Sequence, residues 1–351
     1  MDFLYSNFPP LKTTKHSFSD EFYLLLSESD ALDIAVGYVT ADSLAELKKT
    51  VEMNDKLSRL RLIIGMHFLD KFTEQEYHSA MELNSFLKNS SRGSVKLVTP
   101  FRFHGKLYAY ERNGIPYAGV IGSNNLSSII GNSSRVYEAS VLFKDQQDVC
   151  ELIHFINELD KEATEEIDCL DICDFKEKKN PLLENHENVF GVPPAGIESI
   201  KNNLTSITFT IPLKSTLRSN LNVFFGKGRE ARNGLIKPRH WYEVELIVPK
   251  ELTCKSEYPK SKTDSAEFDV VTDDGWRFKC KVSGDFSKNF RSADDLKILG
   301  KWIKGRLENA GALKVGELVT PEVFKKYGRD NFSLTKTKEN GLWFLDFGVD
   351  R

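Results

Sequence analysis

Residues 31–163 alternate short apolar runs with segments of helical periodicity, and this alternation constrains the fold more than any other feature. Apolar runs of about four to eight residues are typical of buried strands, whereas apolar residues three and four positions apart are typical of covering helices. This order predicts an α/β domain built around a largely buried sheet. The expected strands are 32–39, 59–65, 95–98, 106–110, 117–121 and 137–143, and the expected helices are 41–51, 74–87 and 146–161.

A histidine and a lysine stand where the strand at 106–110 begins. Because alternate residues of a strand share a face, His104 and Lys106 should lie on the same side. Two cations on a polar face would form the floor of an anion site. We expect that face to carry His104, Lys106, Tyr108 and Tyr110, with Gly105, Leu107 and Ala109 towards the core.

Two further polar groups follow along the chain. The run Val120-Ile121 ends at Gly122-Ser123-Asn124-Asn125, a turn of small residues that could bring backbone N–H groups and the Asn125 amide close to a phosphate. Glu138 lies in the apolar run 137–143, where a carboxylate normally has a partner, and we expect that partner to be a histidine.

These residues predict phosphodiester chemistry without a metal ion or another cofactor. An imidazole can attack a phosphodiester and hold the phosphoryl group covalently. Glu138 would orient the ring, and Lys106 and Asn125 would stabilise charge on the phosphate oxygens. We therefore expect a catalytic set of His104, Lys106, Ser123, Asn125 and Glu138.

Each part also has a structural interpretation. A chain with seven histidines can contain His-x-Lys by chance, and Gly-Ser-Asn-Asn is more often only a turn. Glu138 alone could be an edge or surface residue. The combination, in this order and beside apolar strands, favours the catalytic interpretation.

The pattern resembles the signature of the phospholipase D superfamily, His-x-Lys with a downstream Gly-Ser-x-Asn and a later Glu. The resemblance implies that His104 is the nucleophile, that Lys106 and Asn125 bind phosphate, and that Glu138 orients the histidine. The superfamily usually has Asp five residues after the Lys, where this chain has Glu111, and the stretch from there to Gly122 is longer than usual.

Superfamily active sites combine two copies of this motif, with one histidine attacking and the other acting as general acid. This chain has one copy, because its other six histidines lack the Lys two residues later and the Gly-Ser-x-Asn. The resemblance therefore implies a homodimer, formed through the nuclease domain, with the catalytic pocket on its two-fold axis.

The charge distribution indicates that the two halves have different tasks. The net charge is −3, yet residues 1–190 carry 20 basic and 30 acidic residues, whereas residues 191–351 carry 28 and 21. Seven basic residues stand against Glu230 within 212–240, interleaved with Asn and Phe. Such a run is often only a solvated face. Its amides and cations also suit recognition of double-stranded DNA.

The second half resembles the C-terminal domain of NgoFVII-type and BfiI-type restriction endonucleases in Ser219-Asn220-Leu221-Asn222, 272–275, 299–302 and 327–330. This implies a mainly β pseudobarrel like that of plant B-three transcription factors, with an N-arm at 219–237 and a C-arm at 283–291 entering the major groove. The implied DNA-binding candidates are Arg218, Asn220, Asn222, Lys227, Arg229, Arg232, Asn233 and Lys237 near the N-arm, and Lys288, Asn289 and Arg291 in the C-arm.

The expected organisation is a nuclease domain at 1–175, a linker at 176–200 and a recognition domain at 201–351. In the second half we expect strands at 206–212, 223–225, 241–248, 267–272, 276–282 and 344–347, a hairpin turn at Asp273-Asp274-Gly275, and one clear helix at 296–309. Five scattered cysteines complete no zinc site. No run is long enough to span a membrane and no leader is evident, so we expect a cytoplasmic protein.

Together these features predict a type II-like restriction endonuclease that cuts double-stranded DNA at or near a short specific site, independently of metal, through a phosphohistidine-type intermediate. The resemblance implies a cognate DNA methyltransferase and, in some family members, a separately encoded helicase-like ATPase. The alternatives are a site-specific DNA-binding protein with an inactive nuclease domain, a phospholipid-cleaving phosphodiesterase, and a nonspecific nuclease, which would not need the second half.

Overall fold

The computed structural model describes residues 1–131 and 136–349, and the chain forms two compact units. The first unit comprises Met1–Lys178 together with Gly228–Pro238. The second unit comprises Lys179–Lys227 and the chain from Arg239 onward. Among the described residues, none of the helices has the length and apolar character needed to cross a membrane.

An eight-stranded mixed sheet is the centre of the first unit, with the order β1-β7-β6-β5-β2-β3-β4-β8. Strands β2, β3 and β4 are parallel, and the other neighbours pair antiparallel. The bounds are β1 Asp2–Tyr5, β2 Ala31–Val36, β3 Arg59–Ile64, β4 Gly93–Val98, β5 Lys106–Arg112, β6 Ile115–Gly122, β7 Ala139–Phe143 and β8 Thr164–Glu166.

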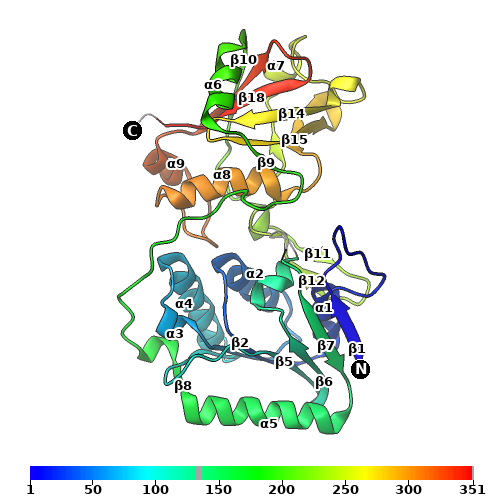
Figure 1. The fold of residues 1–351 in the computed structure, drawn as a ribbon, viewed down its shortest axis with the longest axis vertical. Coiled ribbons are helices and arrows are strands. Elements are labelled where there is room, and N and C mark those ends of the chain that lie inside the picture. The colour runs from blue at the N-terminus through cyan, green and yellow to red at the C-terminus, as the bar shows by residue number, and fades with distance from the viewer. Residues whose placement is uncertain (132–135, 350–351) are drawn as a thin grey trace. The chain divides into compact units, whose positions relative to one another are not determined.

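Helices cover both faces of this sheet (Figure 1). Helices α1 (Phe18–Glu28), α2 (Ala41–Met53) and α4 (Glu74–Asn89) pack on one face, and α5 (Gln146–Ala163) packs on the other. Side-chain caps fix where three of them begin. Ser17 accepts from the Asp20 N–H at α1, Thr73 forms a capping box with Glu76 at α4, and Asp145 accepts from the first turn of α5. The expected α/β domain is therefore confirmed.

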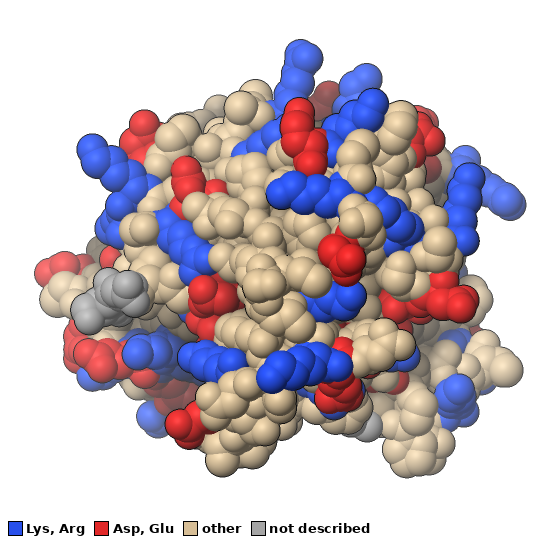
Figure 2. All heavy atoms as spheres, turned by 90° about the horizontal axis from the view of Figure 1, so that it is seen from above, with Lys and Arg blue, Asp and Glu red and all other residues tan. Residues whose placement is uncertain are grey.

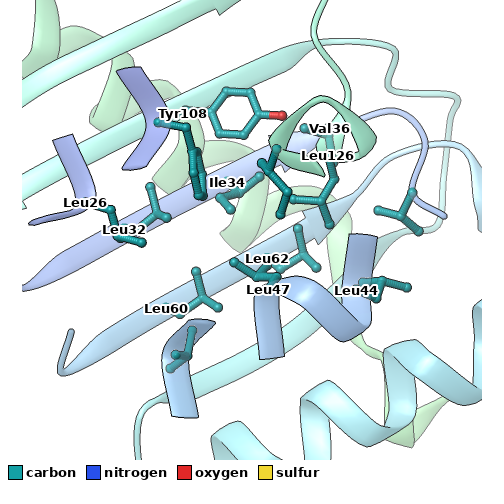
Figure 3. Packing of buried hydrophobic residues seen from close by; sticks show 14 of the residues in the cluster. Leu26, Leu32, Ile34, Val36, Leu44, Leu47, Leu60, Leu62, Tyr108 and Leu126 are labelled. Carbon is teal, nitrogen blue, oxygen red and sulfur yellow. The ribbon is translucent and has the colours of Figure 1, made fainter. Parts of the chain in front are cut away.

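The strand β5 differs from the sequence expectation on one face. Tyr108 is fully buried in the core beneath α1 and α2 (Figure 3). Tyr110 is buried in the same core, so the predicted polar face ends at Lys106. Leu107 and Ala109 pack under α5, as expected. The prediction was wrong for the two tyrosines because both faces of a central strand are buried in a helix-covered sheet.

The second unit is mainly β, as expected, with the strand order β10-β17-β18-β14-β15-β16-β13 and β9 paired to β15. Strands β14 and β18 are parallel. The turn at Asp273-Asp274-Gly275 joins β14 to β15, with Gly275 at a positive φ. The bounds are β9 Phe190–Gly191, β10 Leu204–Pro212, β13 Leu246–Ile247, β14 Glu267–Thr272, β15 Trp276–Ser283, β16 Asn289–Ser292, β17 Asn331–Thr337 and β18 Leu342–Asp346.

Several boundaries of the second half were predicted wrongly. Residues 223–225 form a 3-10 turn, η3 (Val223–Phe225), and only Leu246–Ile247 of the expected strand 241–248 is paired. The expected helix is α8 (Lys297–Asn309). The second unit also contains three helices that were not predicted, α6 (Pro194–Asn202), α7 (Lys250–Thr253) and α9 (Pro321–Tyr327). The stretch 176–200 is not a free linker, because its part from Lys179 onward belongs to the second unit and includes β9.

The hairpin of β11 (Arg229–Glu230) and β12 (Ile236–Lys237) belongs to the first unit although its sequence lies between two segments of the second. Leu235 is buried in the core beneath α1 and α2. The side-chain amide of Asn54, which follows α2, bonds both the backbone N–H and the carbonyl of Ile236 at 2.8 Å. This hairpin is therefore an integral part of the first unit.

Candidate active site and DNA-recognition loops

The His104 imidazole lies beside a buried ammonium at the start of β5. His104 is exposed, whereas Lys106 is only 6% exposed. The Lys106 Nζ donates to the His104 carbonyl at 2.8 Å and lies 3.1 Å from His104 Nε2. Burial lowers the pKa of the Lys106 ammonium, and the Glu138 carboxylate acts in the opposite direction by favouring the charged form. The two side chains thus lie side by side, as the spacing predicts.

The turn after β6 presents Asn125 and uses its neighbours structurally. Asn125 Oδ1 accepts a hydrogen bond from the backbone N–H of Tyr38 at 3.0 Å, which leaves its Nδ2 as the end that can donate to a phosphate. Asn124 is buried and accepts from Ser140 Oγ at 2.5 Å. Ser123 Oγ accepts from the Ala139 N–H at 2.9 Å and so ties β6 to β7. Ser123 therefore has a structural bond in addition to its predicted catalytic role.

Gly122 is required by the close approach of β7 to this turn. A Cβ at this position would lie 2.1 Å from Ser140 Oγ and 2.4 Å from Ser140 Cα. The glycine of the motif therefore serves packing between β6 and β7.

Glu138 precedes β7 and is anchored through its backbone. Its N–H donates to Ser6 Oγ at 2.9 Å, and its carbonyl accepts from the Ser6 N–H at 3.0 Å. Within the described part of the chain, no hydrogen bond joins its carboxylate to His104. The expected orienting bond is thus absent from this structure, and the Glu138 carboxylate instead favours the charged form of Lys106.

Glu111, which stands where the superfamily usually has Asp, has a structural contact at the far end of β5. Its Oε1 lies 2.5 Å from Arg59 Nη2, and Arg59 also bonds the buried Asp33. Five residues of strand separate Glu111 from Lys106, roughly 16 Å. Glu111 is therefore part of an ion-pair network that joins β2, β3 and β5.

Sequence reasoning missed Gly37 and Tyr38, which follow β2. The Tyr38 ring meets the His104 ring edge to face, with centroids 5.7 Å apart. A Cβ on Gly37 would lie 3.1 Å from His104 Cδ2. Nothing in the local sequence marks them, because β2 and β5 become neighbours only in the folded sheet.

The N-arm candidates are divided between the two units. Arg229, Arg232, Asn233 and Lys237 are exposed on the hairpin of the first unit, where Asn233 Nδ2 donates to Ser27 Oγ and Lys237 Nζ lies 4.1 Å from the Tyr23 ring centroid. In the second unit Arg218 and Lys227 are exposed and Asn220 is half-buried.

Asn222 corrects the list of candidates. It is 1% exposed, and its amide donates to the Thr216 and Val319 carbonyls and accepts from the Val319 N–H. All these bonds hold the loop in place, so Asn222 has a structural function in this conformation rather than a surface available to DNA.

The C-arm presents one residue that the sequence did not single out. Phe286 is 62% exposed, adopts a left-handed backbone (φ 57°) and lies under Lys250 Nζ at 4.2 Å from the ring centroid. A left-handed conformation is costly for a bulky residue and is common at binding sites. Lys288 is exposed, Asn289 is half-buried with its Oδ1 in no hydrogen bond among the described residues, and Arg291 Nε lies 3.5 Å from Glu245 Oε1.

Basic and acidic side chains are mixed on the face of the molecule that Figure 2 shows. In this space-filling view, Lys and Arg side chains are spread among carboxylates rather than gathered in one uninterrupted patch.

One group of side chains in the described part of the chain could hold a metal ion. It consists of Glu166, Asp168 and Cys169, and the Lys88 ammonium already pairs with both carboxylates. All five cysteines are free, and Cys280 is buried.

Solved structures with a similar arrangement include Nuc, a phospholipase D family member, and two further proteins. Nuc from Salmonella typhimurium has 10% identity and a TM-score of 0.31, covering 47% of this chain and 95% of its own. NucT from Helicobacter pylori has 14% identity and a TM-score of 0.31, covering 46% and 98%. Phosphatidylserine synthase from Haemophilus influenzae has 14% identity and the same TM-score, covering 48% and 41%. These scores are too low for the likenesses to bear on function.

Family models match both halves of the chain, whereas no curated protein matches it. The model for the NgoFVII restriction endonuclease N-terminal PLD domain matches residues 18–173. The model for the NgoFVII C-terminal B3-like DNA-binding domain matches residues 199–338. Because the two matches span most of the chain in this order, the chain belongs to the NgoFVII restriction endonuclease family, with a phospholipase D-superfamily nuclease domain followed by a B3-like DNA-binding domain.

Proposed function

We propose that this nuclease is a type II-like restriction endonuclease that hydrolyses double-stranded DNA at or near a short specific site, without a metal ion and through a phosphohistidine intermediate. The observation that carries the proposal is the placement of Lys106 Nζ 3.1 Å from the exposed His104 imidazole. A nucleophile and a phosphate-binding cation are thereby held together before substrate arrives.

The reaction would proceed in two displacements. An imidazole nitrogen of His104 attacks phosphorus, a P–N bond forms, and the P–O bond to the leaving strand breaks. The leaving oxygen takes a proton from His104 of the partner subunit. Water then attacks phosphorus, the P–N bond breaks, and the proton from water passes to that second histidine. Lys106 and Asn125 Nδ2 would stabilise the non-bridging oxygens, each by about 3 kcal/mol.

A homodimer would supply the second histidine, and an uncovered part of the sheet supports this. One cross-strand row runs from Phe3 through Val141 and Ile121 to Leu107. Helix α5 covers the row at Leu107, whereas Ile121 is 43% and Phe3 51% exposed. The row lies one residue from the Gly122-Ser123 turn, so a second copy packed there would lie beside the catalytic residues.

Recognition would be the task of the exposed cations and amides of the two arms. The exposed Lys227, Arg218 and Lys288 would contact phosphates, and the exposed Phe286 ring would contact a base or a thymine methyl group. A cognate DNA methyltransferase would protect the same site, and a separately encoded helicase-like ATPase is a further possible partner. A cytoplasmic enzyme fits such a DNA substrate.

Incubation of the purified protein with plasmid DNA in EDTA tests the proposal. We expect a discrete ladder of fragments, with affinity that falls steeply as salt rises. Smearing would indicate a nonspecific nuclease, and strict dependence on magnesium would contradict the metal-independent mechanism. Binding to one site without cleavage would indicate an inactive nuclease domain, and turnover of phospholipid vesicles without DNA cleavage would favour a phospholipid-cleaving enzyme.

Mixed dimers test the shared site. If each site needs a histidine from both subunits, an equal mixture of wild-type protein and the His104→Ala variant should, after exchange, have about a quarter of the wild-type cleavage activity per total amount of protein. Retention of half of the activity would show that each subunit acts alone.

A further inference from the structure

The segment after β2 contacts both residues that are proposed to act on the phosphate. The Tyr38 backbone N–H donates to Asn125 Oδ1 at 3.0 Å, and the Tyr38 ring lies edge to face with the His104 ring at 5.7 Å. Gly37 leaves room for this approach, since a Cβ there would lie 3.3 Å from His104 Cα. One residue thus joins two catalytic candidates that come from different strands.

The far end of the Tyr38 side chain is also fixed. Its hydroxyl donates to Asp70 Oδ2 at 2.8 Å, and Arg102 Nε donates to Asp70 Oδ1 at 2.8 Å. Because Arg102 stands two residues before His104, these bonds close a ring of contacts around the histidine loop. The hydrogen bond with Asp70 raises the pKa of the Tyr38 hydroxyl, while Arg102 and then Tyr38 lower the pKa of Asp70. At neutral pH the Tyr38 hydroxyl therefore stays protonated and the Asp70 carboxylate stays ionised, so the hydrogen bond between them is kept.

A second histidine supports the Tyr38 segment from behind. His67 is buried, stacks on Phe72 at 4.5 Å, and accepts from the Val39 N–H through Nε2 at 3.1 Å. The Tyr38 ring meets the His67 ring edge to face at 5.5 Å. The segment after β2 is therefore anchored on rigid core groups, as a positioning element must be.

We propose that Tyr38 is a positioning residue of the nuclease: its ring sets the orientation of the His104 imidazole, its N–H turns the Asn125 amide towards the phosphate, and Asp70 with Arg102 holds the ring in place. The proposal rests on the proposed function, in which His104 and Asn125 act on one phosphate. A misplacement of about 1 Å at a reacting group can lower a rate roughly 100-fold, so a residue that touches no substrate can still govern turnover.

Single-turnover cleavage of supercoiled plasmid in EDTA measures the effect. Tyr38→Ala should lower the cleavage rate about 10- to 100-fold while plasmid affinity stays near that of the wild type. Tyr38→Phe keeps the ring and the N–H but loses the bond to Asp70, so it should recover most of the rate. Tyr117→Phe is the matched control, because its hydroxyl donates to Glu28 at 2.8 Å away from this site, and it should cut like the wild type.

A chemical readout that needs no cleavage accompanies the kinetics. Diethyl pyrocarbonate acylates accessible imidazoles, and peptide mapping locates the product. Loss of the Tyr38 ring should raise the acylation rate of His104 several-fold in Tyr38→Ala, while the exposed His154 reacts as before. Circular dichroism melting of the same variants reports whether they fold.

The outcomes separate the two proposals. Wild-type cleavage by Tyr38→Ala, or a rate loss that Tyr38→Phe does not recover, would overturn the positioning role. Equal His104 acylation in all variants would overturn it as well. Should the wild type fail to cut while Tyr38→Ala still alters His104 acylation, the proposed function fails and the contact between Tyr38 and His104 stands.

Discussion

Two opposing influences act on the pKa of the Lys106 ammonium beside His104. Burial disfavours the charged form of Lys106, and the Glu138 carboxylate favours it. A phosphate bound there would receive a direct ion pair in a poorly solvated place, where such an interaction is strong.

Replacement of the proposed nucleophile tests this arrangement. His104→Ala should abolish plasmid cleavage and leave site-specific binding unchanged, because the recognition loops are elsewhere in the chain. Cleavage assays and gel-shift measurements report the two properties, with His154→Ala as an exposed control. Loss of binding together with cleavage would place His104 outside catalysis.

Lys304 in α8 offers a pH test of the second unit. It is fully buried, its Nζ donates to the Trp241 carbonyl at 2.6 Å, and burial lowers its pKa to about 7 although Glu308 acts in the opposite direction. Between pH 7 and 10 the unfolded chain binds a proton at this lysine that the folded chain does not, so stability should rise with pH. The slope should reach at most about 1.4 kcal/mol per pH unit.

Urea denaturation between pH 7 and 10 measures that slope. Lys304→Met should flatten it, whereas the exposed Lys279→Met should not. An equal slope in all three proteins would show that Lys304 does not titrate in this range.

At the residue scale, the sequence reveals the parts of the site whose spacing is local. His104 and Lys106 are two residues apart on one strand edge, so alternation alone places them together. The proposed role of Asn125 was inferred from its motif. Tyr38 stands 66 positions before His104 in the sequence, and only the pairing of β2 with β5 brings them into contact. No local pattern encodes which strands become neighbours.

At the scale of elements, long segments with one clear period were predicted well. Expected helices 41–51, 74–87 and 146–161 differ from α2, α4 and α5 by two residues at one end. Helix α1 was missed although Phe18, Phe22 and Leu25 recur at helical spacing on its buried face. Residues 223–225 look like a strand, yet the amide bonds of Asn222 set a tight turn there.

At the scale of elements, we also predict how the C-arm loop contributes to DNA affinity. Phe286→Ala should weaken specific binding by about 1–3 kcal/mol, roughly 5- to 150-fold, while the salt dependence of binding stays the same, because an apolar contact releases no counterions. Titrations of plasmid fragments at two salt concentrations measure both. Phe190→Ala, which removes a similarly exposed ring from β9, should bind normally. Identical affinities of the two variants would exclude Phe286 as a DNA contact.

At the scale of the whole molecule, acidic and basic residues are distributed unequally between the two halves of the sequence. The first 190 residues have ten more acidic than basic residues, and the remaining 161 have seven more basic than acidic. An acidic nuclease unit would repel DNA that no recognition loop holds, which would limit cleavage away from specific sites.

Assembly is tested through the exposed row of the sheet. Ile121→Lys should shift the protein towards monomers and lower cleavage while DNA binding persists, since a charge there would have to be desolvated at the interface. Sedimentation velocity and plasmid cleavage check the two effects. Ile115→Lys, on the same strand and 55% exposed, should remain a dimer. A dimeric, active Ile121→Lys protein would place the interface on another surface.

The hairpin at 228–238 determines how the protein can be cut into fragments and when its first unit can fold during synthesis. The chain crosses between the units at residues 178–179, 227–228 and 238–239, so no single cut separates them. A fragment that ends near Phe190 would lack Leu235 and leave a gap in the core beneath α1 and α2. During synthesis the nuclease unit becomes complete only after residue 238 has left the ribosome. The nuclease unit therefore completes its fold only after part of the DNA-binding domain has been synthesised.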